Sequence, residues 1–153
     1  NSRKKMKRLS SLLLVIFPWI VFAGCSANDD EVPILMIYPF VRATVAGQSS
    51  AAGYIEFHSS KAVKLVKVSS PQAGSVQIHT MSHDNGIMRM SELPALDIPA
   101  GKTIKLEPGH MHFMLVDLKA PLRADDDATL SFTFEFADKS TLQLNALAEI
   151  RAN

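Results

Sequence analysis

Short runs of alternating apolar and polar residues follow one another along most of the chain. Nine such runs are rich in Val, Ile, Phe and Thr, and they lie at 34–38, 54–57, 62–68, 76–81, 87–90, 103–106, 111–118, 130–136 and 141–147. Gly, Pro, Asn and Asp mark the turns between them. No stretch combines a long 3.6-residue period with helix caps. Many short strands at this spacing predict an all-β protein, a sandwich or barrel with little helix.

One hairpin can be predicted residue by residue. Asn85-Gly86 is the preferred central pair of a type I′ turn, which fixes the register of the two strands that it joins. The opposed pairs are then Asp84 with Ile87, His83 with Met88, and Met81 with Met90. Met81, His83, Met88 and Met90 share one face because side chains alternate along a strand; His79 shares it too and lies diagonally from Met90. Val76 and Ile78 point to the other face, which we expect to be the core.

Histidine and methionine gather between residues 79 and 114. This stretch holds four of the five histidines and five of the seven methionines, namely His79, Met81, His83, Met88, Met90, His110, Met111, His112 and Met114. By strand alternation His110, His112 and Met114 share a face, and Met111 points oppositely. Imidazole and thioether suit the soft ion Cu(I) and are poor ligands for Ca, Mg or Mn. The chain has one cysteine, Cys25, so a blue-copper centre within the domain is excluded.

That cysteine follows a segment typical of an export signal. Five of the sixteen basic residues lie in the first eight positions, and the apolar run after them is too short to span a bilayer. The run ends in Phe22-Ala23-Gly24-Cys25, which resembles the lipobox of bacterial lipoproteins. We therefore expect a lipoprotein signal peptide at 1–24, a lipidated tether at 25–31 and a periplasm-facing domain at 32–153. Whether Met6 is the start, and which membrane holds the lipid, stay open.

Charge and motifs exclude other classes of function. From Cys25 onward the chain carries 11 basic and 15 acidic residues, whereas a nucleic-acid surface needs a basic excess. The sequence offers no Ser/His/Asp arrangement in a supporting context and no Gly-rich phosphate loop, so we do not expect an enzyme. We expect a monomer that touches the membrane only through its lipid anchor.

Four residues resemble the signature of the PCuAC family of periplasmic copper chaperones. That signature is a His, ten residues, a Met, twenty-one residues and His-x-Met, and the matching residues are His79, Met90, His112 and Met114. Ala52-Gly53-Tyr54 and Ile98-Pro99-Ala100-Gly101 also match the family. The resemblance implies a cupredoxin-like, Greek-key β-sandwich that holds one Cu(I) through these four residues. It also implies delivery to a copper acceptor, either the copper subunit of cytochrome oxidase or a Sco-type protein.

Three functions stay open at this point: copper delivery, copper sequestration or tolerance, and a non-metal envelope lipoprotein that binds another protein. Individual residues also have simpler interpretations than metal binding. We expect His58 to be an ordinary hydrogen-bonded histidine, and Met88 and Met111 to be packing residues. Met81, His83 and His110 are undecided between supporting ligands and plain surface.

Overall fold

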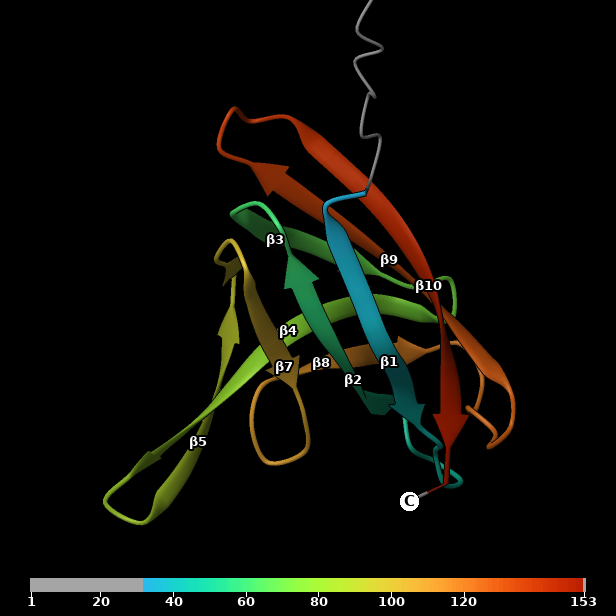
Figure 1. Ribbon diagram of the computed structural model, residues 1–153. Coiled ribbons are helices and arrows are strands. Elements are labelled where there is room, and N and C mark those ends of the chain that lie inside the picture. The colour runs from blue at the N-terminus through green and yellow to red at the C-terminus, as the bar shows by residue number, and fades with distance from the viewer. Residues whose placement is uncertain (1–31, 153) are drawn as a thin grey trace, which may run out of the picture. The chain divides into compact units, whose positions relative to one another are not determined.

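The computed structural model describes residues 32–152 as ten strands with no helix among them (Figure 1). The strands are β1 (Ile34–Arg42), β2 (Ser50–Ser59), β3 (Val63–Ser69), β4 (Ala73–Asp84), β5 (Ile87–Leu93), β6 (Leu96–Ile98), β7 (Lys102–Leu106), β8 (His112–Leu118), β9 (Asp127–Phe136) and β10 (Thr141–Arg151). The all-β prediction is confirmed, and only β6 was not predicted. The signal peptide and tether predicted at 1–31 lie outside the described residues. Within 32–152 no helix is long and apolar enough to cross a membrane.

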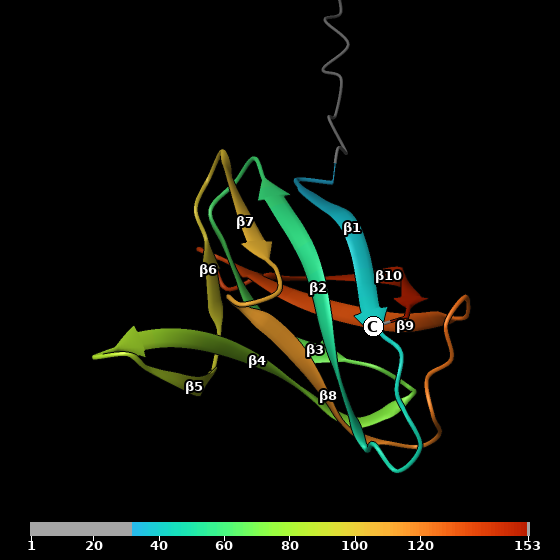
Figure 2. The ribbon, with the colours of Figure 1, turned by 90° about the horizontal axis from the view of Figure 1, so that it is seen from below.

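The strands join edge to edge in one mixed sheet. Their order is β5-β4-β8-β2-β1-β10-β9-β3-β6, and β7 pairs with β2 beyond the end of β8. Only the pairing of β1 with β10 is parallel among the described strands. The sheet turns back on itself, because Phe57 on β2 packs edge-on against Phe132 on β9 with ring centroids 5.3 Å apart. The two halves of the sheet thus form the layers of a sandwich (Figure 2).

Aromatic side chains from both layers fill the space between them. Phe57, Phe113, Phe132 and Phe134 are all fully buried, and along β2 and β9 every second residue is buried. The apolar residues that recur at every second position of the sequence are therefore the side chains that point into the core. Phe113 lies on β8 opposite Gly53 on β2, and its ring occupies the space that a side chain at position 53 would need.

Gly53→Ala should therefore destabilise the domain. A Cβ atom at this position would lie 1.9 Å from Cε2 of Phe113, whose ring is fully buried and cannot move without displacing its neighbours. We expect the free energy of unfolding to fall by about 1–3 kcal/mol, the usual cost of overpacking, in urea unfolding experiments. Adding Phe113→Leu to Gly53→Ala should recover part of this loss, because it vacates that space. A Gly53→Ala protein as stable as the wild type would contradict the packing described here.

The β4–β5 hairpin projects from the body of the sandwich (Figure 1). Asn85 and Gly86 have φ of 50° and 79°, the positive values that a type I′ turn requires at both positions. The observed pairs are the predicted ones: Asp84 with Ile87, His83 with Met88, and Met81 with Met90. Residues 82–92 are all exposed, and β5 is an edge strand. The predicted register is confirmed, and it places the hairpin's methionines at the surface.

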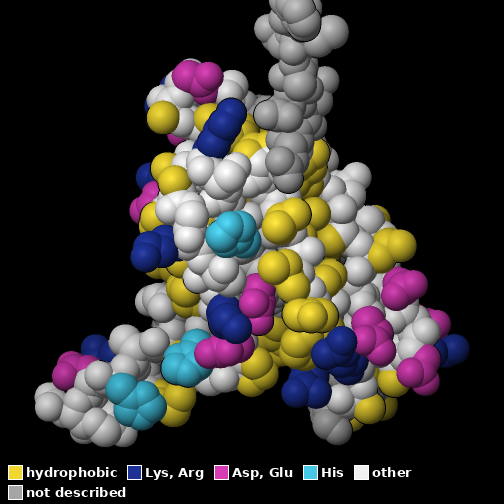
Figure 3. Space-filling model, viewed as in Figure 1, with side chains coloured by type: hydrophobic (Ala, Val, Ile, Leu, Met, Phe, Trp, Pro, Cys, Tyr) yellow, Lys and Arg dark blue, Asp and Glu magenta, His cyan; other side chains and the backbone are white. Residues whose placement is uncertain are grey.

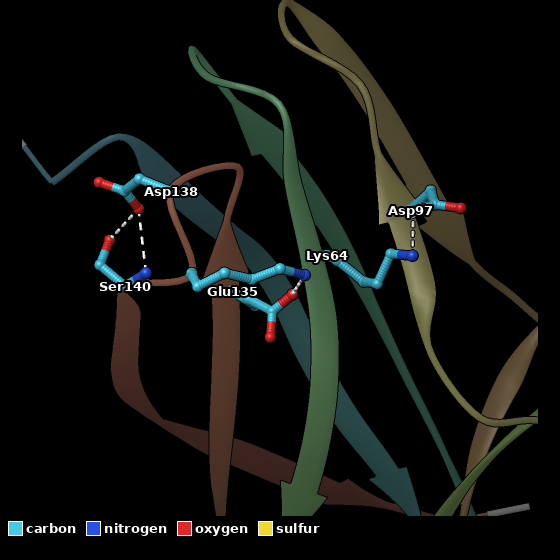
Figure 4. A network of polar contacts seen from close by, with 6 residues as sticks. Lys64, Asp97, Glu135, Asp138 and Ser140 are labelled. Carbon is cyan, nitrogen blue, oxygen red and sulfur yellow. Dashed lines mark hydrogen bonds and ion pairs between the residues drawn. The ribbon is translucent and has the colours of Figure 1, made fainter.

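At the opposite edge of the sheet, charged residues pair on the surface (Figure 4). Lys64 on β3 contacts Asp97 on β6 at 3.4 Å, and Lys139 contacts Glu135 at 2.8 Å beside the β9–β10 turn. In that turn the Ser140 N–H and O–H both donate to Oδ1 of Asp138. Exposed pairs of this kind contribute little to stability. These contacts shape an edge and a turn, and they bring no histidine or methionine together.

Candidate metal centre

Strands β4 and β8 place two histidines side by side. His79 lies directly opposite His112 in the antiparallel ladder, with ring centroids 5.5 Å apart and ring planes at 81°. Directly opposed residues share a face, which here is the outer face, because the neighbouring residues Ile78 and Phe113 point into the core. His112 is nevertheless only 5% exposed. The two rings are therefore adjacent; the His112 ring is shielded from water, and His79 is half-buried.

Each histidine keeps one ring nitrogen free. Nδ1 of His112 donates to the carbonyl oxygen of His110 at 3.2 Å, which leaves the lone pair on Nε2. Nε2 of His79 lies 3.0 Å from Oε1 of Gln77, and a hydrogen bond donated to that oxygen leaves the lone pair on Nδ1. This Nδ1 is the one buried side-chain nitrogen or oxygen in residues 32–152 that has no hydrogen-bond partner. Metal-binding histidines are commonly held in this way, with the second ring N–H donated to a carbonyl oxygen.

Electrostatics favour the neutral form of His79. Burial lowers the pKa of its ring below the ordinary value of 6.5, and the neighbouring His112 lowers the pKa further. Glu92, opposite His79 on β5, acts in the other direction. The neutral imidazole is the form that binds a metal ion. At neutral pH the His79 ring is therefore ready to bind.

The two predicted methionine ligands lie on opposite sides of this histidine pair. Met114 is two residues beyond His112 on the same face, opposite Gln77. Met90 lies diagonally from His79, opposite Met81, and is 51% exposed. On a flat sheet Met90 and Met114 would be about 16 Å apart at Cα, given strands about 4.8 Å apart and about 3.3 Å per residue. An ion shared by both thioethers therefore requires this face to be concave, or to close when the ion binds.

An aromatic row continues from the histidines across β2 and β1. The Tyr54 ring centroid lies 6.4 Å from that of His112, and the Phe40 centroid lies 4.9 Å from that of Tyr54. The guanidinium groups of Arg42 and Arg151 lie over the Phe40 ring, at 5.6 Å and 4.5 Å from its centroid. Apolar rings beside a metal site limit the access of water to it. The aromatic row thus bounds the centre on the side opposite the hairpin.

Oxygen and nitrogen donors alone do not complete a metal site here. In the part of the chain that the structure describes, no three His, Cys, Asp or Glu side chains come together as a metal-binding group. The thioethers of Met114 and Met90 lie on the same face as the histidine pair, and thioether ligands select a soft metal. Sequence reasoning missed Gln77, which orients His79. Gln77 could have been found from the sequence, because it lies two residues before His79 and therefore on the same face of the strand.

Two sequence predictions about the neighbouring residues are wrong. His110 does not continue the β8 alternation, because β8 begins at His112; its exposed ring lies in the preceding loop, with Nε2 3.8 Å from Glu107. Met88 is not a packing residue, since it lies on the projecting hairpin and is 51% exposed. Two other predictions are confirmed. His58 hydrogen-bonds Oγ1 of Thr103 at 3.1 Å, and Met111 packs against the core.

Comparison with known proteins identifies the family. The model of the family described as "Putative lipoprotein LpqE-like" matches residues 34–146, nearly all of the described domain. The chain belongs to the LpqE-like family. A relative from Leifsonia xyli subsp. xyli, "Putative lipoprotein Lxx21020", is 38% identical over 103 residues, covering 67% of this chain and 61% of that protein. The LpqE-like chain thus spans about three fifths of this relative's length. The uncharacterized protein RP573 of Rickettsia prowazekii is 29% identical over 125 residues, covering 75% of this chain and 69% of that protein.

Solved structures show that the fold resembles that of PCuAC domains. The apo PCuAC domain from PmoF1 superposes on this LpqE-like domain with a TM-score of 0.61 at 23% identity, covering 79% of this chain and 95% of that one. The solution structure of CuI-DR1885 from Deinococcus radiodurans gives a TM-score of 0.60 at 29% identity, covering 86% of this chain and 87% of that one. The predicted cupredoxin-like β-sandwich is therefore confirmed for the LpqE-like domain.

Proposed function

We propose that this LpqE-like domain binds copper as Cu(I) and passes it on as a metallochaperone. The observation that carries the proposal is the buried, unpartnered Nδ1 of His79 beside the His112 ring, with the Met114 thioether on the same face. These are neutral, soft-to-borderline donors of the kind that Cu(I) prefers. The domain is similar to the structure named CuI-DR1885, and the Cu(I) in that name supports the same metal here.

The predicted ligands are His79, Met90, His112 and Met114. Each carries a neutral donor, so the charge of the ion stays uncompensated, which favours moderate affinity and release to a thiolate-rich acceptor. Thioethers cannot form a disulfide, so such a site survives in an oxidising compartment where a cysteine pair would close. Four protein ligands also leave little open coordination for catalysis, which favours transport over an enzymatic role.

The proposed destination is the copper site of cytochrome oxidase, reached directly or through a Sco-type protein. Storage or detoxification would use the same ligands, so the two roles differ in what happens when the protein is lost. Deleting the gene should lower oxidase activity at limiting copper, and added copper should restore that activity. Normal oxidase activity together with greater copper sensitivity would instead show sequestration. If the purified domain takes up no Cu(I) in an anaerobic titration, both copper roles fail, and a non-metal binding module remains.

We also propose that Cys25 carries a lipid that anchors the protein in the envelope. The lipoprotein descriptions of the family and of the Leifsonia relative support this anchor. The wild-type protein should fractionate with membranes, and Cys25→Ser should yield an uncleaved or soluble form, because the acylated thiol is gone. Cell fractionation followed by immunoblotting measures this. A wild-type protein found wholly in the soluble periplasm would show that Phe22 spoils the lipobox.

A further inference from the structure

The outer half of the β4–β5 hairpin carries a second group of soft donors. Met81 lies opposite Met90 and His83 lies opposite Met88, so the four side chains form two successive rungs on one face. Figure 3 shows histidine side chains on this projecting arm and near its base. Opposed residues on neighbouring strands have Cβ atoms about 4.5–5.5 Å apart, close enough for two side chains to bind one ion.

The two faces of the arm differ sharply in chemistry. The opposite face carries the pairs Thr80 with Ser91, Ser82 with Arg89 and, at the tip, Asp84 with Ile87. These are hydroxyl and charged side chains apart from Ile87, and none of them is a soft donor. Every thioether and imidazole of the arm therefore lies on the face that continues from His79. A surface exposed on both sides gives no packing reason for this separation. A ligand that prefers sulfur and imidazole to hydroxyl groups does give one.

These donors make no hydrogen bond to a described residue, and packing partly covers only Met81, which is half-buried. Met88 and Met90 are each 51% exposed, although methionine is ordinarily a filler of cores. His83 is exposed, and its ring makes no hydrogen bond or ion pair to any residue that the structure describes. The histidine pair at the base differs in both respects, since His112 is buried and its Nδ1 is held by a carbonyl oxygen. The donors of the arm are free but not preorganised.

We propose that Met81, His83 and Met88 form a second, weaker Cu(I) site near the hairpin tip. Met90, between the two groups, is within reach of either site. The inference rests on the proposed function only for the identity of the metal. The tip site should be weaker because its ligands are exposed and must lose side-chain freedom on binding. The tip site is exposed, so a partner protein can reach it. It therefore suits a step in which copper enters or leaves the protein by exchange of one ligand for another. The ion stays Cu(I) throughout this step.

The test is an anaerobic titration of the whole chain with Cu(I) against a chromogenic Cu(I) chelator. The wild type should bind one equivalent tightly and a second at least about tenfold more weakly, a gap typical of losing one supporting interaction at a metal site. The double variant His83→Ala with Met88→Ala should lose the second equivalent and keep the first unchanged. The matched control is Ser82→Ala with Arg89→Ala, the adjacent rung on the other face, which should keep both equivalents.

NMR of the methionine methyl groups locates the second ion. The Met88 methyl resonance should shift only with the second equivalent of Cu(I), and that of Met114 only with the first. A wild type that stops at one equivalent, with the Met88 methyl unmoved by excess Cu(I), would overturn the tip site. The variant His112→Ala with Met114→Ala separates the two proposals, since it should lose the tight equivalent and keep the weak one. If the tight equivalent survives in that variant, the assignment of the main site is wrong while the tip site stands.

Discussion

Replacing His112 and Met114 together by alanine should lower the affinity for the tight Cu(I) ion by more than about 100-fold. Loss of a group that only supports a ligand typically costs about 10–100-fold in metal affinity, and this variant removes two direct ligands. A backbone carbonyl oxygen, that of His110, holds the His112 ring through Nδ1. The His79 ring is held by the side chain of Gln77, which has more freedom to move than a backbone group. Glu92 lies opposite His79 on β5, but a hard carboxylate oxygen is a poor substitute for the two lost ligands of a soft ion.

Two further variants control for this result. His58→Ala removes a histidine that hydrogen-bonds Thr103 and stands outside the site, so the affinity should not change. Gln77→Ala removes the partner of His79 Nε2 and should weaken binding by about tenfold, because the ring loses its orientation and not its donor atom. Chelator competition measures all three proteins. Equal affinities for the His112/Met114 double variant and the wild type would contradict the assignment.

Affinity for Cu(I) should fall steeply with pH once protons compete for the histidines. At pH values well below the ordinary imidazole value of about 6.5, the loss should reach about two decades per pH unit if both histidines are ligands, and about one if only one is. The pKa of His79 is lowered by burial and by His112, so proton competition at His79 begins below pH 6.5. Thioethers do not titrate. Measurements of the apparent Cu(I) constant from about pH 8 to about pH 5 bracket the ordinary imidazole value.

The single variant His79→Ala sharpens this measurement, since its profile should keep a slope of about one decade per pH unit from His112 alone. A flat wild-type profile would remove both histidines from the site. The copper-free protein gives an independent check. Because the pKa of His79 is lower in the folded state, the unfolded chain takes up the proton first, so stability should decrease as the pH falls below 6.5. That decrease should be smaller in His79→Ala between about pH 6.5 and about pH 5, a range above the ordinary carboxyl values.

Local sequence signals predicted the elements near the copper face well. The Asn85-Gly86 turn alone determined the pairing of β4 with β5, because a two-residue turn leaves one register. Strand β2 was predicted only from Tyr54, although it starts at Ser50. Its first residues, Ala51, Ala52 and Gly53, have low strand propensity, and the packing of Phe113 over Gly53 explains why this segment is a strand.

Contacts between distant strands were beyond local reasoning. Strand alternation placed His79 and His112 each on a donor-rich face, but it could not show that β4 pairs with β8, since that pairing depends on the whole sheet order. The errors at His110 and Met88 have the same origin. His110 was placed by extending an alternation past the true start of β8, and Met88 was expected to pack although no layer covers the arm that carries it.

The four signature residues are separated by two intervals, from His79 to Met90 and from Met90 to His112. These two intervals should differ in how well they tolerate an inserted or deleted residue, because only the first one contains a tight turn that fixes a strand register. One residue added to the Asn85-Gly86 turn would either break its type I′ geometry or slip β5 by one position, and a slip turns Met90 to the opposite face. The stretch from Pro94 to Met111 is different. His112 is placed by hydrogen bonds between β4 and β8, so the β6–β7 connection at Pro99-Ala100-Gly101 can lengthen without moving it. A one-residue insertion should therefore be tolerated at Pro99-Ala100-Gly101 and not between Asn85 and Gly86.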